Sequence, residues 1–337
     1  MGVKHQSQKS LGQAICKSLA SQSVIQTLCH ADILLLQRKT ISEVASLLGL
    51  ADLRIGPSPI KFGANQGEQA MKHVEWPGAG YELEIAGITD PGLVRPSNED
   101  SLVVLKDLVP PSRYLAVAGV FDGVGGLAHG ALASSAAAQC LAQIAGDPLS
   151  PGSPTVPEAQ LEEILRQLHE TVRKRGLDGP TLMGMATTAT VALLVRACPV
   201  TLWIGHVGDS PAFCLRDGQL QKLIREDSLV CDLVRQGLVA PEDAPRHPQR
   251  HIITQALGSP QGIDPHVGAH VVEPGDCFLL CTDGLTAMVS EKTMRTILDS
   301  EPPHRACTEL IRAANSAGGI DNVTVIIMKF IPTHSRY

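Results

Sequence analysis

Residues 114–126 read YLAVAGVFDGVGG: an apolar run that ends on Asp122 and continues directly into glycines. A short apolar run with a carboxylate and a Gly turn at its tip is typical of a buried strand followed by a tight loop. The pattern recurs in VTLWIGHVGD (200–209) and CFLLCTD (277–283), and in reverse order in DNVTVIIMKF (321–330). The chain therefore contains several buried strands that each carry an Asp at one end.

Other apolar runs complete a set of strands, and helical stretches lie between them. Further strands are expected at YELEIAGI (81–88), SLVVL (101–105) and TATVALLV (188–195). Helical patterns fall at about 127–146, 157–175, 228–238, 290–299 and 302–316. Strands outnumber helices, and turns such as Arg216-Asp217-Gly218-Gln219 fit hairpins, so antiparallel sheets flanked by helices are favoured over a regular βαβ alternation.

The composition is that of a globular protein with an aliphatic core. Of the 337 residues, 44% are hydrophobic and 18% are charged, while aromatic residues make up only 3%. The core must therefore consist of Ala, Val, Leu and Ile. The net charge of −6 leaves no basic surplus to neutralise phosphates, and a nucleic-acid partner is not expected.

Cysteine use and the N-terminal sequence indicate a reducing compartment. The nine cysteines form no CxxC pair, which fits neither a disulfide framework nor a zinc site. Cys277 and Cys281 lie in an apolar run and are expected in the core. The N-terminus lacks a signal-peptide apolar region, no run of about 18 apolar residues occurs, and Gln6 breaks the myristoylation pattern. We expect a cytoplasmic protein without a membrane contact.

The pattern changes along the chain in a way that predicts two regions joined by a linker. Residues 1–56 are expected to form a helical N-terminal region, since apolar residues recur there at helical spacing. Gly and Pro accumulate in residues 57–80, which we interpret as a linker. Residues 81–331 carry the strands described above and form the larger domain.

One segment of the N-terminal region has a sequence that could indicate DNA binding. The segment TISEVASLLGLADLR (40–54) is similar to the first half of a helix-turn-helix. Pro57 and Pro59 fall where a recognition helix would have to run, and Pro breaks helices. A docking or regulatory module is therefore favoured over DNA binding. Retention of DNA by residues 1–56 alone would support the DNA-binding alternative.

The placement of carboxylates carries the most information about chemistry. Any one strand-end Asp next to Gly is best explained as an ordinary turn residue. Four such residues in one domain, together with the adjacent pair Glu99 and Asp100, are not explained by turns: Asp122, Asp209, Asp283 and Asp321. Buried carboxylates are costly unless they are paired, and hard divalent cations such as Mg²⁺ or Mn²⁺ prefer oxygen ligands. A cation-binding cluster is the predicted partner.

The order of eight motifs resembles the metal-dependent protein phosphatase family (PPM, type 2C), in its bacterial form. The motifs are TDPGLVRPSNEDS, VFDGVGGLAHGALAS, GMATT, HVGDS, DGQLQKLIREDSLV, HPQRHIITQALG, CTDGL and GGIDNVTV. One of them alone would be weak, because DG and GG are frequent, but eight in family order extend through about three quarters of the chain. The resemblance implies an α+β fold: a four-layer α/β/β/α sandwich of two packed antiparallel sheets, with metal ions at one end.

The resemblance implies a role for each matching residue toward two ions of Mg²⁺ or Mn²⁺. Asp122 would bridge both ions, and the carbonyl of Gly123 would add a ligand to one of them. Glu99 would support that same ion, while Asp283 and Asp321 would hold the other.

Three further positions match residues of the family that act around the two ions. Asp100 would act nearby, largely through water. Asp209 matches a residue of a third, weaker metal site that also uses Asp283. Arg95 matches the phosphate-binding arginine, and its planar fork of donors suits phosphate oxygens.

The implied activity is hydrolysis of phosphoserine or phosphothreonine in a protein, by attack of a water that the two ions activate. The substrate would be a phosphorylated protein, the target of a Ser/Thr kinase. The alternative is a catalytically inactive binding or regulatory protein on the same fold. The intact inner set argues against it: Glu99, Asp122, Asp283 and Asp321.

Departures from the family pattern lie outside that inner set. They are Val124, Ala131, Ala186, Pro211, the pair Glu226-Asp227, and Gln255. Val124 stands where some members, chiefly eukaryotic ones, carry a His thought to act as general acid. We expect such changes to alter substrate docking, the behaviour of the family's mobile flap or the affinity of the third metal site. No His of this chain is assigned a catalytic role, since lone histidines are more often structural.

Overall fold

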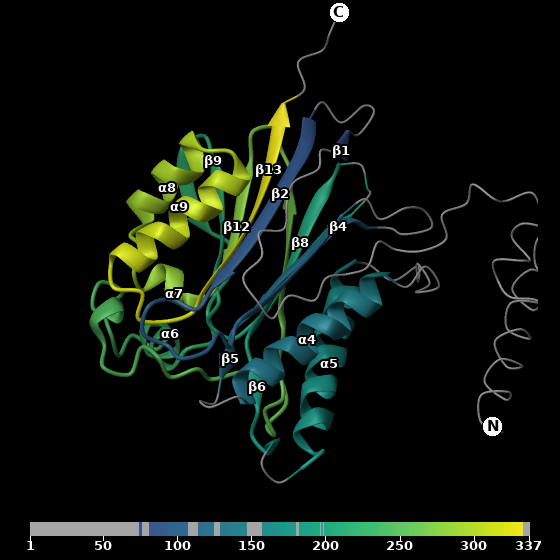
Figure 1. Ribbon diagram of the computed structural model, residues 1–337, viewed down its shortest axis with the longest axis vertical. Helices are drawn as coiled ribbons and strands as arrows, with labels where there is room; N and C mark the ends of the chain where they lie inside the picture. The colour runs from purple at the N-terminus through teal and green to yellow at the C-terminus, as the bar shows by residue number, and fades with distance from the viewer. Residues whose placement is uncertain are drawn as a thin grey trace, which may run out of the picture. The chain divides into compact units, whose positions relative to one another are not determined.

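The computed structural model describes residues 74–75, 81–106, 114–124, 129–146, 157–179, 182–195, 197 and 199–332. These residues build four layers, in which two antiparallel sheets pack together and a pair of helices covers the outer face of each (Figure 1). The predicted α+β sandwich is confirmed. Within the described part of the chain, no helix has the length and apolar character needed to cross a membrane.

The first sheet has six strands in the order β1-β2-β13-β12-β9-β10. Their bounds are β1 (Val74–Glu75), β2 (Tyr81–Asp90), β9 (Ala212–Arg216), β10 (Gln219–Lys222), β12 (Cys277–Cys281) and β13 (Val323–Pro332). The predicted hairpin joins β9 to β10, with Asp217 and Gly218 both at positive φ, as a two-residue turn between twisted strands requires.

The second sheet has five strands in the order β11-β8-β7-β4-β3, and a short two-stranded sheet pairs β5 with β6. The bounds are β3 (Ser101–Lys106), β4 (Tyr114–Phe121), β5 (Gly123–Val124), β6 (Ala186–Thr187), β7 (Ala189–Val195), β8 (Thr201–Val207) and β11 (His266–Val271).

The helices form the two outer layers. Contacts place α4 (His129–Gly146) and α5 (Pro157–Gly176) on the five-stranded sheet, and α8 (Glu291–Ser300) and α9 (Pro303–Ser316) on the six-stranded sheet (Figure 1). Three shorter elements lie in connections: α6 (Leu229–Arg235), the 3₁₀ turn η3 (Ala244–Arg246) and α7 (Asp283–Thr286). The four long helices and α6 fall where the sequence predicted helices; α7 was not predicted.

The central strands β4, β7 and β12 are apolar or nearly so because both of their faces are buried. Along β12, Phe278 and Leu280 face the core between the sheets, while Cys277, Leu279 and Cys281 face the helices α8 and α9. This alternation follows from the two-residue period of a strand. The two cysteines are fully buried core residues, as predicted.

The domain boundaries stay a prediction. The expected helical region 1–56 lies outside the described residues, as does most of the expected linker 57–80. Within that linker range, Val74–Glu75 forms β1 and pairs with β2 at the edge of the six-stranded sheet.

Candidate active site

The strand ends gather the predicted acidic residues at one end of the sandwich. Asp100 directly precedes β3 and Asp122 directly follows β4, and the pairing of Ser101 with Phe121 makes the two strand ends neighbours. On the other sheet, β12 and β13 pair so that Asp283, which opens α7, lies at the same strand ends as Asp321. The topology therefore brings together carboxylates that lie far apart in the sequence.

The electrostatics show that these carboxylates face one another. Burial raises the pKa of Asp122 well above its usual value, and the charges of Asp100 and Asp283 raise it further. Burial, and then the charge of Asp321, likewise raises the pKa of Asp283, whose carboxyl is close enough to share a hydrogen bond with that of Asp122. Like charges held this close need a counter-charge.

Asp100 connects the two sheets. Its Oδ2 accepts hydrogen bonds from the hydroxyls of Thr282 (2.9 Å), which directly follows β12, and Thr324 (2.7 Å), which lies in β13. Burial raises the pKa of Asp100 to about 7, against the lowering effect of the two threonines. Its Oδ1 is buried without a hydrogen-bond partner among the described residues, so one oxygen is structural and the other is left to bind something else.

Glu99 lies against the glycines that surround Asp122. A Cβ on Gly130, in the first turn of α4, would lie 2.5 Å from Glu99 Oε2 and 2.7 Å from the carbonyl oxygen of Gly123. A Cβ on Gly123 would lie 2.4 Å from the Gly130 carbonyl and 2.6 Å from that of Glu99. The two predicted ligands Glu99 and Gly123 therefore flank one small space that glycine keeps open. Gly125 and Gly126 lie outside the described residues.

Two threonines of the GMATT motif hold the backbone of Asp122. The amide of Asp122 donates to Thr188 Oγ1 (3.0 Å), and its carbonyl accepts from the Thr188 amide (2.8 Å) and from Thr187 Oγ1 (2.8 Å). Thr188 Oγ1 also bonds Ser210 Oγ at 2.7 Å. The side chain of Asp122 therefore extends from a backbone fixed on both sides, at the β4–β5 junction.

Arg95 lies at the solvent-exposed edge of the carboxylates. Its Nη2 donates to Asp321 Oδ2 at 2.8 Å, and both side chains are partly exposed. That hydrogen bond raises the pKa of Arg95, and the charges of Glu99 and Asp122 add to the effect. The structure thus brings Arg95 to the acidic cluster, as predicted.

Asn322 fixes the loop that carries Arg95 and Glu99. Its Oδ1 accepts from the Glu99 amide (2.8 Å), and its Nδ2 donates to the carbonyls of Pro91 (2.9 Å) and Ser97 (3.0 Å). The side chain is buried, so these three bonds place the loop beside Asp321 with little freedom.

Asp209 lies in the turn after β8, in an environment with further acids, and we call residues 228–255, which follow further along the chain, the flap. Burial raises the pKa of Asp209 to about 8, and the charges of Asp283 and Glu226 add to the rise. Asp209 Oδ1 is buried without a hydrogen-bond partner among the described residues. The structure therefore groups Asp209 with Asp283, and it adds Glu226 to that side of the cluster.

Two of the departures from the family pattern contact each other at the two ends of the flap. Asp227 Oδ2 accepts from the Gly208 amide (3.0 Å), and its Oδ1 accepts from Gln255 Nε2 (3.1 Å). Gln255 Oε1 in turn accepts from the Asp264 amide at 2.6 Å. Asp227 and Gln255 therefore fasten the turn that carries Asp209 to the base of the flap.

The buried histidines are structural, as expected. His206 bonds Thr190 Oγ1 (2.8 Å) and the Gly208 carbonyl (2.7 Å), and burial lowers the pKa of His206 to about 3, so it stays neutral. His169 accepts from the Gly258 amide at 3.2 Å.

The donors in the cluster suit a hard divalent cation. They are carboxylates and one carbonyl, the ligand types that Mg²⁺ and Mn²⁺ prefer. Among the described residues, no three His, Cys, Asp or Glu side chains surround one point as a metal site of their own. Mg²⁺ usually retains several waters and binds through one or two protein carboxylates, so it does not require a group of three. One carboxylate of the cluster, that of Asp321, is also engaged by Arg95.

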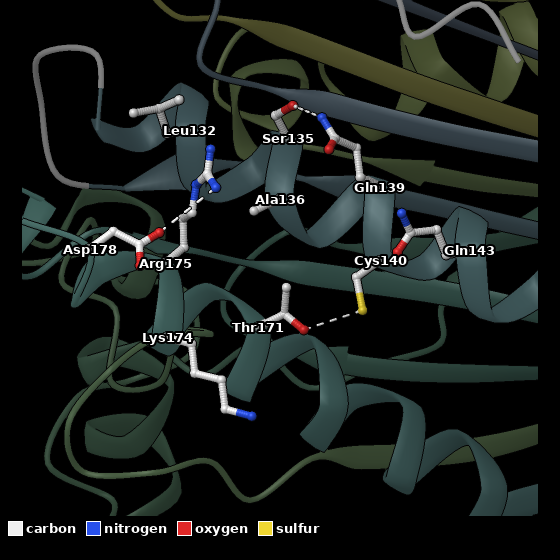
Figure 2. A pocket seen from close by; sticks show the side chains of 10 residues that line it. All are labelled: Leu132, Ser135, Ala136, Gln139, Cys140, Gln143, Thr171, Lys174, Arg175 and Asp178. Carbon is white, nitrogen blue, oxygen red and sulfur yellow. Dashed lines mark hydrogen bonds and ion pairs between the residues drawn. The ribbon is translucent and has the colours of Figure 1, made fainter. Parts of the chain in front are cut away.

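A separate hollow of about 400 Å³ lies between α4 and α5 and holds none of the predicted site residues (Figure 2). Polar side chains line much of it, with Cys140 Sγ and Thr171 Oγ1 3.3 Å apart. Its lining has no group of carboxylates, so it offers no comparable chemistry.

Several positioning residues escaped the sequence analysis. They are Thr187, Thr188, Thr282, Asn322, Thr324 and also Asn98, whose Oδ1 accepts from the Asp100 amide at 3.1 Å. Their signal was present, because each is a polar residue that is next to a predicted site residue, lies within an apolar strand or belongs to the GMATT motif, and an unpaired hydroxyl or amide in a buried place would be costly. Partners on a different sheet could not be assigned without the topology.

Comparisons with known proteins agree with this geometry. The sequence matches the Protein phosphatase 2C family over residues 98–318. Serine/threonine protein phosphatase PstP of Mycobacterium tuberculosis is 36% identical over 245 residues, which cover 73% of this chain and 44% of PstP. Protein phosphatase PhpP of Streptococcus pneumoniae is 34% identical over 254 residues, which cover 73% of this chain and 97% of PhpP.

A solved structure has the same architecture. The catalytic domain of serine threonine protein phosphatase PstP, in complex with 2 manganese ions, superposes with a TM-score of 0.63 at 32% identity, over 74% of this chain and 98% of that one. The family match extends over more than half of the sequence and includes Glu99, Asp122 and Asp283, while Arg95 and Asp321 lie just outside it. The chain therefore belongs to the protein phosphatase 2C family.

Proposed function

We propose that this protein is a metal-dependent serine/threonine protein phosphatase with its active site at the acidic cluster. The observation that carries the proposal is the gathering of Glu99, Asp122, Asp283 and Asp321 beside Arg95 at one end of the sandwich. Relatives named as protein phosphatases support the reaction, although the chain spans only 44% of the length of PstP.

Four residues and one carbonyl would hold two ions of Mg²⁺ or Mn²⁺. Asp122 would be shared, Glu99 and the Gly123 carbonyl would serve one ion, and Asp283 and Asp321 the other. The manganese-bound PstP structure supports divalent ions as the cofactor class. When bound, such a pair lowers the pKa of a water and neutralises charge on the phosphate.

The other residues act on the substrate or on these ligands. Arg95 would bind two phosphate oxygens through its guanidinium, after exchanging its bond with Asp321 for the phosphate. Asp209 and Asp283 would serve a third, weaker site, and Asp100 would act through its unpartnered Oδ1 and a water. Asn322, Thr187 and Thr188 hold the loop and the strand end in place.

The physiological substrate would be a phosphorylated protein, the target of a Ser/Thr kinase. A catalytically inactive binding or regulatory protein is the second candidate. The intact inner set disfavours it, because an inactive protein gains nothing from holding four acidic side chains together.

Hydrolysis of p-nitrophenyl phosphate by the purified full chain tests the proposal. We expect turnover with Mn²⁺ or Mg²⁺, none with EDTA, and recovery when metal is returned, because the carboxylates cannot act on phosphate without a cation between them. Turnover that survives chelation would contradict the metal-dependent mechanism.

The role of residues 1–78 can be tested by deletion. We expect a chain that begins at residue 79 to keep its kcat/KM for p-nitrophenyl phosphate, since among the described residues the deletion removes only the two-residue edge strand β1. The rate is measured at saturating Mn²⁺ beside circular dichroism. Deletion through residue 90 is the control, because it removes β2, which pairs with β13 over ten residues, and should abolish folding. Loss of folding on the shorter deletion would place the N-terminal region within the catalytic domain.

A further inference from the structure

Large apolar side chains are exposed at the edge of the proposed active site. Among the described residues, Leu93 is 69% exposed, Val94 64% and Ile320 52%. These three form what we call the apolar rim. Other exposed apolar residues lie elsewhere along the chain, such as Leu177 after α5 and Leu238 after α6.

The rim is one surface because two turns pack together. The amides of Leu93 and Val94 both donate to the Gly319 carbonyl, at 2.7 and 3.2 Å. A Cβ on Gly319 would lie 2.9 Å from Leu93 Cγ, and one on Gly318 would lie 3.7 Å from Ile320 Cγ2. The side chains of Leu93 and Ile320 therefore lie beside the same glycine turn.

The rim is also held rigidly. Gly92 has a φ of +74°, and a Cβ there would lie 2.2 Å from the Asp321 carbonyl, so only glycine permits the approach. Asp90 Oδ1 accepts from the Gly92 amide (2.9 Å) and from Asn315 Nδ2 (3.1 Å). Exposed apolar groups on a fixed backbone lose little entropy when they are covered, which favours binding.

The rim borders the position proposed for the phosphate. Val94 directly precedes Arg95, and Ile320 directly precedes Asp321, and these two charged residues bond each other at 2.8 Å. A peptide whose phosphate reaches Arg95 brings its neighbouring residues within reach of the rim, because an extended chain advances only about 3.3 Å per residue. The residues within two positions of the phosphorylated one are those that can reach it.

We infer that the apolar rim binds an apolar side chain of the substrate within two residues of the phosphoserine or phosphothreonine. The inference rests on the proposed function and adds a substrate preference to it. Covering Leu93 and Ile320 with an apolar residue removes exposed apolar surface from water, whereas a polar residue gains nothing there.

The test uses two phosphothreonine peptides that differ only at the four positions within two residues of the phosphothreonine, which are all Leu in one peptide and all Gln in the other. For the full chain with Mn²⁺, we expect kcat/KM to be about tenfold higher for the Leu peptide, the range that one apolar contact provides. In Leu93→Ser and Ile320→Ser, this ratio should fall toward one. Leu177→Ser, at a residue that is 68% exposed after α5, is the matched control and should keep the ratio.

The outcomes separate the inference from the proposed function. Absence of turnover on both peptides and on p-nitrophenyl phosphate would overturn the proposed function itself. Turnover with equal rates on the two peptides, or a preference that Ile320→Ser leaves intact, would overturn only the inference. Sedimentation that reveals a dimer dispersed by Ile320→Ser would also overturn it, because the rim would then bind a second copy of the chain.

Discussion

Replacing Asp122 with Asn is expected to abolish catalysis while making the metal-free protein more stable. Asp122 is the proposed bridging ligand, and an amide cannot supply a negative oxygen to each of two cations. We expect kcat/KM for p-nitrophenyl phosphate to fall about a thousandfold or more, as when a main electrostatic group of an active site is removed. The assay is run at saturating Mn²⁺.

The stability effect has the opposite sign. Burial and the neighbouring carboxylates raise the pKa of Asp122 in the folded protein, so its ionised form disfavours folding at any pH above its unfolded value near 4. Asn carries no charge, and in EDTA at pH 7 the variant should unfold at a higher urea concentration than the wild type. Added Mn²⁺ should stabilise the wild type more than the variant, because an ion that binds only the folded state stabilises it.

Asp276→Asn is the matched control. Asp276 is more deeply buried than Asp122 and lies at the opposite end of β12 from Asp283, where it accepts from Arg216 Nε (2.7 Å) and Nη2 (2.6 Å). Its loss should cost about 1–2 kcal/mol of stability, a value reduced because Arg216 is partly exposed. Activity should remain. If Asp122→Asn destabilised the metal-free protein as Asp276→Asn does, or kept activity above a tenth, Asp122 would be a structural residue.

The fold was largely predictable because the buried strands appear in the sequence as short apolar runs. Runs such as CFLLC in β12 are apolar on both faces, and the strand-end Asp residues mark the same edge of both sheets. The short helix α7 was not predicted, because its four residues show no helical period and depend on the turn after β12. The position of a strand end against the other sheet depends on long-range pairing, which the local sequence pattern does not reveal.

The site likewise has residues that could be predicted from the sequence and contacts that could not. The carboxylates at the strand ends could be predicted as ligands because an ionised side chain at a buried strand end needs a partner. The bonds from Thr282 and Thr324 to Asp100 join residues separated by 182 and 224 positions, and they depend on the packing of the two sheets. The contact between Asp227 and Gln255 shows the same limit: both were noted as departures from the family pattern, and only the structure pairs them.

Gly130→Ala should impair catalysis although it improves the helix. Ala is a better helix former than Gly by about 1 kcal/mol, and α4 begins at His129, so local propensity predicts stabilisation. The added methyl, however, would lie 2.5 Å from Glu99 Oε2 and 2.7 Å from the Gly123 carbonyl oxygen. Contacts that short push both proposed ligands of one ion out of place, which costs about a hundredfold when reacting groups shift by an ångström.

The expected result is a lower kcat and a higher Mn²⁺ concentration for half-maximal activity, measured by titrating Mn²⁺ against p-nitrophenyl phosphate hydrolysis. Gly146→Ala, at the other end of the same helix, is the control because nothing lies within 4 Å of its added Cβ. That variant should keep both values and lose no stability. A Gly130→Ala protein with the wild-type metal requirement would show that Glu99 and the Gly123 carbonyl do not hold an ion, since no cation bound between them could tolerate the intruding methyl group.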